Sequence, residues 1–156
     1  MYPSNDLKIV APQAGAVLNV LGADIAVKSS GDPGKFFFAD HAVPPGYAVP
    51  LHVHEDEDEA FYLLEGEVTL ITGDSEKKAR PGDYVHLPRG VPHGFVNASG
   101  APARMLVVAS PGGKLEGLFR GLDAAASQAA ASKAALAPEQ VGEICAAHGV
   151  RMLPPA

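Results

Sequence analysis

Two histidines separated by one residue, His52 and His54, have the clearest potential for chemistry in this chain. In an extended strand, residues two apart point to the same side, so both imidazoles can reach one metal ion. Five acidic residues follow at 55–59, and the last of them, Glu59, begins the apolar stretch Ala-Phe-Tyr-Leu-Leu. A carboxylate at the mouth of a buried strand needs a partner, and a cation is the natural one. The segment therefore predicts a metal site.

The other polar candidates are expected to have ordinary roles. The acids at 55–58 are interpreted as a solvated loop, and His41 and His148 as surface residues. Cys145 lies on an apolar helical face and is expected to be a small buried side chain. No local signature pairs a serine or cysteine nucleophile with a histidine base, so covalent catalysis has no support.

Aromatic side chains supply candidates for a substrate pocket. They fall into groups that share one face of a strand, because alternate residues point the same way. Five residues form this set: Phe36, Phe38, Phe61, Tyr84 and His86. Facing inward, they would line a pocket suited to an aromatic or aliphatic molecule. The alternative is that the phenylalanines belong to an ordinary hydrophobic core.

Glycine and proline indicate the elements that must position these residues. The chain of 156 residues contains 17 glycines and 14 prolines, most of them between residues 31 and 113. Both residues are costly inside helices and common in turns, so this region is expected to be all-β with many short strands. Strands are predicted at 7–10, 16–20, 25–27, 35–41, 51–54, 60–64, 67–72, 84–87, 93–97 and 104–109. Such spacing favours a barrel or a sandwich.

The composition changes after residue 112. Apolar residues at helical spacing predict a helix over 113–122, and the Ala-rich segment 124–137 is either helix or mobile linker. Pro138 is placed to begin a last helix, with Val141, Ile144 and Cys145 on one face. We therefore expect a β-barrel over 1–112 (core motifs 46–97) and a helical C-terminal appendix over 113–156. Deleting 124–156 is expected to leave the barrel folded.

Charge and hydropathy exclude several classes of function. The net charge of -6 does not indicate the basic surface that binding of nucleic acid requires. No apolar run is long enough for a membrane helix, and residues 1–6 do not begin a signal peptide. With one cysteine no internal disulfide can form, so the expected location is cytoplasmic. The expected partner is a small molecule, with neither nucleic acid nor membrane.

Two long-spaced motifs resemble those of the cupin superfamily. The first consists of Gly46, His52, His54, Glu59 and Gly66. The second consists of Gly82, Pro88, Gly90, His93 and Asn97. Both match at every fixed position, and the resemblance covers about residues 35–110. It implies a double-stranded β-helix, that is, a small jelly-roll barrel, with one metal ion bound by His52, His54, Glu59 and His93.

That ligand set is a mixed nitrogen and oxygen site without thiolates, so a four-cysteine structural zinc is excluded. Four protein ligands leave two open positions on a six-coordinate ion, which suits a divalent transition metal: Fe, Mn, Ni or Co. Zn is the alternative in protein as purified. The metal would act as Lewis acid and template.

The chain most resembles small single-domain bacterial cupins of the quercetin 2,3-dioxygenase type. The resemblance implies a metal-dependent dioxygenase, with iron as one candidate metal, acting on a small organic, aromatic or enolisable substrate. It also implies that Glu59 serves as a catalytic base and that the protein is a homodimer. Two alternatives stay open: a non-redox metal-dependent lyase or isomerase, and a non-catalytic small-molecule-binding cupin. Fold alone does not choose among them.

Overall fold

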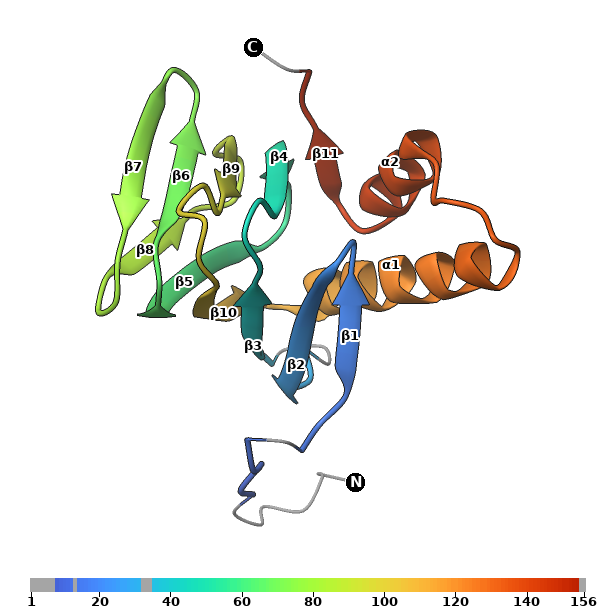
Figure 1. The fold of residues 1–156 in the computed structure, drawn as a ribbon, viewed down its shortest axis with the longest axis horizontal. Helices are drawn as coiled ribbons and strands as arrows, with labels where there is room; N and C mark the ends of the chain where they lie inside the picture. Colours follow the sequence, from blue (N-terminus) through green and yellow to red (C-terminus); the bar gives the residue numbers. More distant parts are fainter. Residues whose placement is uncertain (1–7, 13, 32–34, 155–156) are drawn as a thin grey trace.

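A computed structural model describes residues 8–12, 14–31 and 35–154, and shows a β-barrel with helices on one side (Figure 1). The strands of the described residues are β1(Val17–Val20), β2(Ala23–Ser29), β3(Phe37–Val43), β4(Ala48–His54), β5(Asp58–Glu65), β6(Val68–Thr72), β7(Ser75–Ala79), β8(Tyr84–Leu87), β9(His93–Val96), β10(Ala103–Ser110) and β11(Val150–Met152). The helices are α1(Gly113–Ala131) and α2(Pro138–Ala147).

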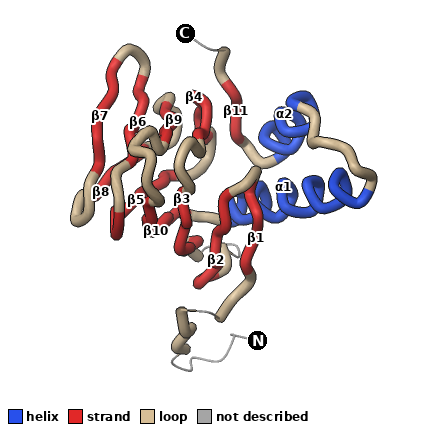
Figure 2. Tube along the Cα trace, viewed as in Figure 1, coloured by secondary structure: helices blue, strands red, loops and turns tan. Residues whose placement is uncertain are grey.

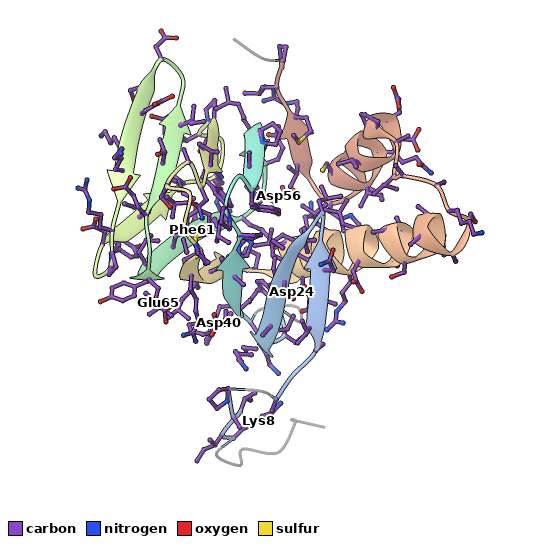
Figure 3. All side chains as sticks on the ribbon, in the orientation of Figure 1. Lys8, Asp24, Asp40, Asp56, Phe61 and Glu65 are labelled. Atoms are coloured by element: carbon purple, nitrogen blue, oxygen red, sulfur yellow. The ribbon has the colours of Figure 1, made fainter. Side chains whose placement is uncertain are left out.

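Two antiparallel sheets face each other. The first has the order β1-β2-β3-β10-β5-β8, and the second has the order β11-β4-β9-β6-β7. Burial alternates along the strands, as in β10, where every second residue faces the interior. The side chains between the sheets, including Phe37, Leu63 and Met105, are fully buried, and Phe61 lies among them (Figure 3). This is the predicted jelly-roll barrel, so the predicted fold class is confirmed.

Most predicted strands are present with bounds shifted by a few residues. The exception is 7–10, because its described residues 8–10 form no strand. Strands β7 and β11 were not predicted. The expectation about residues 1–6 lies outside the described residues. No helix in the described ranges combines the length and apolar character needed to cross a membrane.

The segment after residue 112 is helical as predicted (Figure 2). Helix α1 continues into the Ala-rich segment as far as Ala131, and residues 132–137 form a non-helical connection. Helix α2 begins with Pro138 in its first turn, as expected. The segment then returns to the barrel, because β11 pairs with β4 in the second sheet. The register places Val150 opposite His54 and Met152 opposite His52. The C-terminal segment thus supplies the strand beside the two histidines.

The acidic run at 55–58 is solvated as expected at Glu55, Asp56 and Asp58, which are about half-exposed, and Glu57 is the exception. Each of the four acids nevertheless has its own partner. Glu55 pairs with Arg151 of β11, and Asp56 pairs with Lys114 of α1. Asp58 pairs with Arg89, whose backbone N–H also donates to it. Glu57 is only 2% exposed, and its two carboxylate oxygens accept the backbone N–H groups of Lys114 and Leu115, each at 2.8 Å. The run therefore joins the barrel to the helical segment.

Glu57 satisfies N–H groups that the first turn of α1 leaves free, and its charge complements the positive end of the helix dipole. We expect Glu57→Ala to lower the free energy of unfolding by about 1–3 kcal/mol, because one buried and one partly buried backbone donor lose their acceptor. Urea denaturation measures the change. The matched control is Asp56→Ala, which removes a half-exposed ion pair and should cost less than about 1 kcal/mol. Equal losses in both variants would contradict this role for Glu57.

Candidate metal centre

The two histidines of the first motif lie at the end of β4. Their side chains point to one side of the strand, as alternation predicts, and both are buried. Strand β9 flanks β4 on one edge and β11 flanks it on the other. This arrangement fixes the positions of His52 and His54 from both sides.

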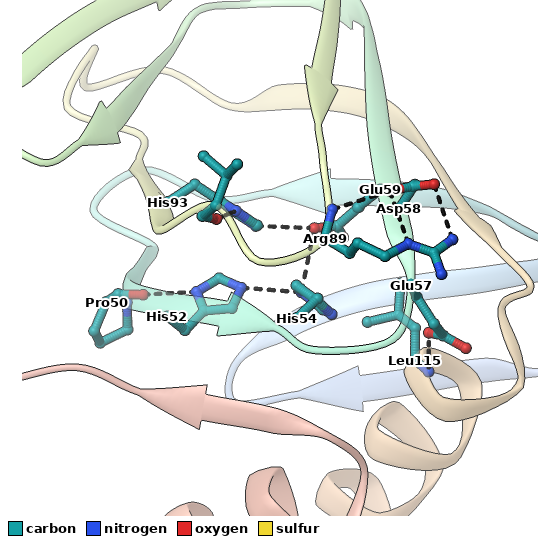
Figure 4. Close-up of polar contacts among 10 residues, drawn as sticks. Pro50, His52, His54, Glu57, Asp58, Glu59, Arg89, His93 and Leu115 are labelled. Carbon is teal, nitrogen blue, oxygen red and sulfur yellow. Dashed lines mark hydrogen bonds and ion pairs between the residues drawn. The ribbon is translucent and has the colours of Figure 1, made fainter.

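The other two candidate ligands come from different strands. His93 begins β9, where it stands directly opposite His52 in the sheet register. Glu59 lies on β5 in the facing sheet and reaches across the interior. Three side chains therefore come from one sheet and one from the other, and all four are buried (Figure 4).

The loop before His93 is fastened at two points. Gly90 adopts a φ of 76°, a left-handed conformation that favours glycine, and its N–H donates to the carbonyl of His54 at 2.8 Å. The guanidinium of Arg89 binds the carboxylate of Asp58, beside Glu59. These contacts connect the loop to both strands that carry the other candidate ligands. The turn residues of the motif thus set the geometry of the cluster.

The distances among the four side chains fit one metal ion. One ligand atom from each of the four lies within 4.8 Å of the others. Nε2 of His52 is 3.1 Å from Nε2 of His54, and Oε2 of Glu59 is 3.4 Å from His54 Nε2 and 3.2 Å from His93 Nε2. Metal–ligand bonds of about 2.1 Å separate neighbouring ligand atoms by about 3.0 Å at a right angle and about 3.4 Å at the tetrahedral angle. The observed separations fall within this range.

Backbone contacts orient two of the rings. Nδ1 of His52 lies 2.8 Å from the carbonyl of Pro50, and Nδ1 of His93 lies 3.0 Å from the carbonyl of Val91. Since a carbonyl only accepts, each Nδ1 carries the proton and donates it, which directs Nε2 toward the centre of the cluster. Ring orientation of this kind is typical of histidine ligands.

Electrostatics in the cluster also favour a cation. Burial lowers the pKa of His52 to about 4, and the charge of His93 acts in the same direction, so this imidazole is neutral near pH 7. Burial alone would raise the pKa of Glu59, but the hydrogen bond from His93 and the charges of the imidazoles outweigh it and lower that pKa. Burial would lower the pKa of His93, and the hydrogen bond with Glu59 raises it. A metal ion would take the place of the proton on His93 Nε2.

The cluster faces a cavity of about 570 Å³ between the barrel and the helices. His52, His54 and Glu59 are part of its wall. Most of the remaining wall is apolar and comes from both halves of the chain. The apolar residues of the wall include Val49, Phe61, Phe95, Val107, Leu115, Leu118, Phe119, Leu122, Val141 and Cys145. The helical segment is therefore part of the site, and the sequence analysis missed its contribution.

The predicted pocket residues are placed differently from expectation. Phe61 lines the cavity, but the other four aromatic candidates do not. Phe36 is 54% exposed, and Phe38 is half-buried on the outer face of β3. Tyr84 is 67% exposed and His86 is also exposed, because β8 turns Leu87 inward instead. Their assignment to the pocket is corrected accordingly.

Two further histidines depart from the surface role that was expected. His148 is half-buried against α1, and its Nδ1 donates to the carbonyl of Ile144. His41 is only 3% exposed and lines the cavity. Its strand alternates with Phe37, Ala39 and Val43 facing inward, which is the signal that could have placed it. Cys145 is buried, as predicted.

Both ring nitrogens of His41 lack a hydrogen-bond partner in the part of the chain that the structure describes. Leaving a buried polar group unpaired costs about 1–3 kcal/mol. Burial lowers the pKa of this imidazole to about 4, so it is neutral near pH 7. The cavity thus holds a second polar group besides the cluster.

Residues 40–109 match the family model described as "Cupin domain". The chain is 36% identical over 62 residues to quercetin 2,3-dioxygenase of Bacillus subtilis, which covers 40% of this chain and 18% of that protein. It is 32% identical over 71 residues to the oxalate-binding protein of Thermotoga maritima, which covers 46% of this chain and 59% of that protein. The chain therefore spans less than two thirds of the length of either relative.

One solved structure is similar to this chain in both fold and sequence. The polyketide cyclase RemF from Streptomyces resistomycificus superposes with a TM-score of 0.57 at 28% identity, over 67% of this chain and 79% of that one. The three similar proteins carry different activities in their names. The activity of this chain therefore has to be argued from its site.

Proposed function

We propose, from the match of residues 40–109 to the family model described as "Cupin domain", that the chain is a metal-dependent dioxygenase acting on a small apolar organic molecule. One observation supports this most strongly: three of the four candidate ligands face a largely apolar cavity of about 570 Å³. A metal site that served only structure would not need an organic-sized cavity beside it. The cavity has the size and lining typical of small-molecule sites.

The donor set restricts the metal. His52, His54 and His93 would supply imidazole nitrogens, and Glu59 a carboxylate oxygen. This combination suits Fe, Mn, Ni or Co, and four ligands leave room on a six-coordinate ion. When bound, such a metal supplies Lewis acidity and, for redox-active ions, access to dioxygen chemistry.

The chain's own residues would prepare the substrate. The apolar wall, including Phe61, Phe95 and Leu118, excludes water and holds a hydrocarbon framework. Glu59 has one carboxylate oxygen, Oε2, directed at the imidazoles of His54 and His93. We assign to its second oxygen the role of accepting a proton from a substrate hydroxyl. A lowered pKa keeps this carboxylate ionised before the substrate arrives.

A non-redox reaction is the second candidate. The similarity to a polyketide cyclase, at 28% identity over two thirds of this chain, favours it, because the name of that protein denotes ring closure and not oxygenation. In that case the same carboxylate and cavity would serve, with the metal polarising a carbonyl. The two candidates differ in whether dioxygen is consumed.

Oxygen uptake separates these candidates. The protein is loaded with Fe(II), Mn(II), Ni(II), Co(II) or Zn(II) and mixed with a panel of enolisable and catecholic compounds. Uptake coupled to substrate loss with a redox-active metal, and none with Zn(II), is the expected result. Turnover under strict anaerobiosis would replace the dioxygenase with the non-redox candidate. Absence of turnover together with tight binding of a panel compound would identify a binding protein.

Glu59→Gln tests the proposed base. The amide keeps the size of the side chain but cannot accept the proton, so kcat should fall by about 100-fold or more while the fold is retained. Steady-state kinetics and thermal unfolding measure the two effects. Glu55→Gln is the matched control, since that acid only pairs with Arg151 at the surface, and its kcat should not change. Wild-type activity of Glu59→Gln with every metal would remove Glu59 from the mechanism.

Three other sequence-based expectations stay predictions. They are the small-molecule partner without nucleic acid or membrane, the homodimer and the cytoplasmic location. The boundary between a barrel over 1–112 and an appendix over 113–156 is likewise a prediction about folding units.

A further inference from the structure

His41 has an environment that the metal cluster does not explain. It lies on β3, between Ile25 of β2 and Met105 of β10 in the sheet register. Its ring contacts Tyr47 and Phe95 edge-on, with centroids 5.7 Å and 6.1 Å away. Neither nitrogen has a hydrogen-bond partner among the described residues, although the side chain is almost fully buried.

The cavity offers His41 no protein partner. The hydroxyl of Tyr47, the nearest polar group on its ring neighbours, already donates to the carbonyl of Val20 at 3.0 Å. Phe95 and Val107 contribute only apolar surface to the same wall. A buried imidazole directed into a cavity and left without partners is suited to a polar group that arrives with a ligand.

The hydrogen-bonding capacity of His41 and the charge of the cavity wall restrict the chemical type of that polar group. A neutral imidazole has one N–H donor and one lone pair, and burial keeps the pKa of His41 at about 4. A hydroxyl can donate and accept, so it can form a hydrogen bond with either ring nitrogen, whereas a carboxylate can only accept. The described residues that line the cavity include neither lysine nor arginine, so nothing there balances a phosphate or a second carboxylate.

We propose that His41 is a recognition residue that hydrogen-bonds a hydroxyl, phenolic hydroxyl included, on an apolar substrate in this cavity. The inference rests on the proposed function, in which the other end of the substrate reaches the cluster of His52, His54, Glu59 and His93. The substrate is therefore a neutral, largely hydrocarbon compound with at least two oxygen substituents. Small dianions such as oxalate, and sugar phosphates, do not fit this class.

Binding of three matched probes tests the proposal. They are 2-naphthol, naphthalene and 2-naphthoate, which share one framework and differ in the polar group. Their fluorescence reports binding to the full-length, metal-loaded protein and to the same protein after chelation. The wild-type protein should bind 2-naphthol at least tenfold more tightly than naphthalene in both forms. In the chelated form 2-naphthoate should bind more weakly than 2-naphthol.

Two variants assign the preference to His41. In His41→Phe the ring packing against Tyr47 and Phe95 is kept but both nitrogens are lost, so the tenfold preference should disappear while naphthalene binds as before. In His41→Gln the amide again offers a donor and an acceptor, so part of the preference should return. Unchanged naphthalene binding shows that the cavity is intact in each variant, which separates recognition from misfolding.

Several results would overturn the inference. Equal binding of naphthol and naphthalene by the wild-type protein would do so, as would a preference that survives in His41→Phe. A preference seen only with metal and insensitive to His41 would place the hydroxyl on the metal, which leaves the proposed function standing. Conversely, the protein could show a His41-dependent preference for 2-naphthol and yet turn over no compound. That result would support recognition by His41 and contradict the proposed dioxygenase activity.

Discussion

Alanine in place of His52 or His93 should reduce the bound transition metal from about one ion per chain to less than about a tenth. Each variant removes one of four ligand atoms that lie 3.1–3.4 Å from their neighbours. Loss of a group that merely orients a ligand costs about 10–100-fold in metal affinity, and loss of a ligand itself should cost more. Elemental analysis of protein purified without chelating resin measures the stoichiometry.

A matched histidine controls for surface binding. His86 is exposed on β8 and lies outside the cluster, so His86→Ala should keep one ion per chain. Because His93 is fully buried, His93→Gln is made in parallel to retain volume, and circular dichroism checks that each variant is folded. Full metal retention by the folded His52 and His93 variants would disprove the ligand assignment.

Ending the chain after Ala137 should lower the melting temperature by about 10 °C or more, or leave the protein insoluble. The truncation removes Cys145 and Val150, which are both buried, and each buried apolar side chain contributes about 1.5–3 kcal/mol. For a chain of this size, 1 kcal/mol corresponds to about 2–4 °C. Removing β11 also leaves an unpaired edge on β4, the strand that carries His52 and His54.

This expectation differs from that drawn from sequence, in which deleting 124–156 leaves the barrel folded. Differential scanning calorimetry and metal analysis of the truncated chain measure both consequences. The control is Arg151→Ala, which keeps β11 and removes only an exposed ion pair with Glu55, so it should shift the melting temperature by a few degrees at most. A truncated chain with wild-type melting temperature and metal content would show that the barrel is self-sufficient.

The cluster could be predicted because strand geometry is simple. Two histidines two residues apart must share a face in an extended strand, and the turn residues Gly46, Gly66, Gly82 and Gly90 all take positive φ as their motif positions require. Spacing alone therefore located three side chains that come from two strands, one in each sheet. The resemblance to cupins supplied His93, which lies far from the others in the sequence.

Other features depended on tertiary contacts that spacing does not encode. Five consecutive acids look alike in sequence, yet among them only Glu57 accepts backbone N–H groups of the first turn of α1 and only Glu59 meets the histidines. Strand β11 is three residues long and gains its conformation from pairing with β4. The predicted strand over 35–41 ends at His41, which favours a surface position, whereas β3 continues to Val43 and keeps His41 inside.

Anomalous diffraction from crystals of the metal-loaded protein, recorded on both sides of the metal's absorption edge, tests the central claim most directly. One peak is expected, within bonding distance of Nε2 of His52, His54 and His93 and of a carboxylate oxygen of Glu59, at the wall of the apolar cavity. A loaded crystal with no peak among these four side chains, or with its peak elsewhere on the chain, would contradict the assignment.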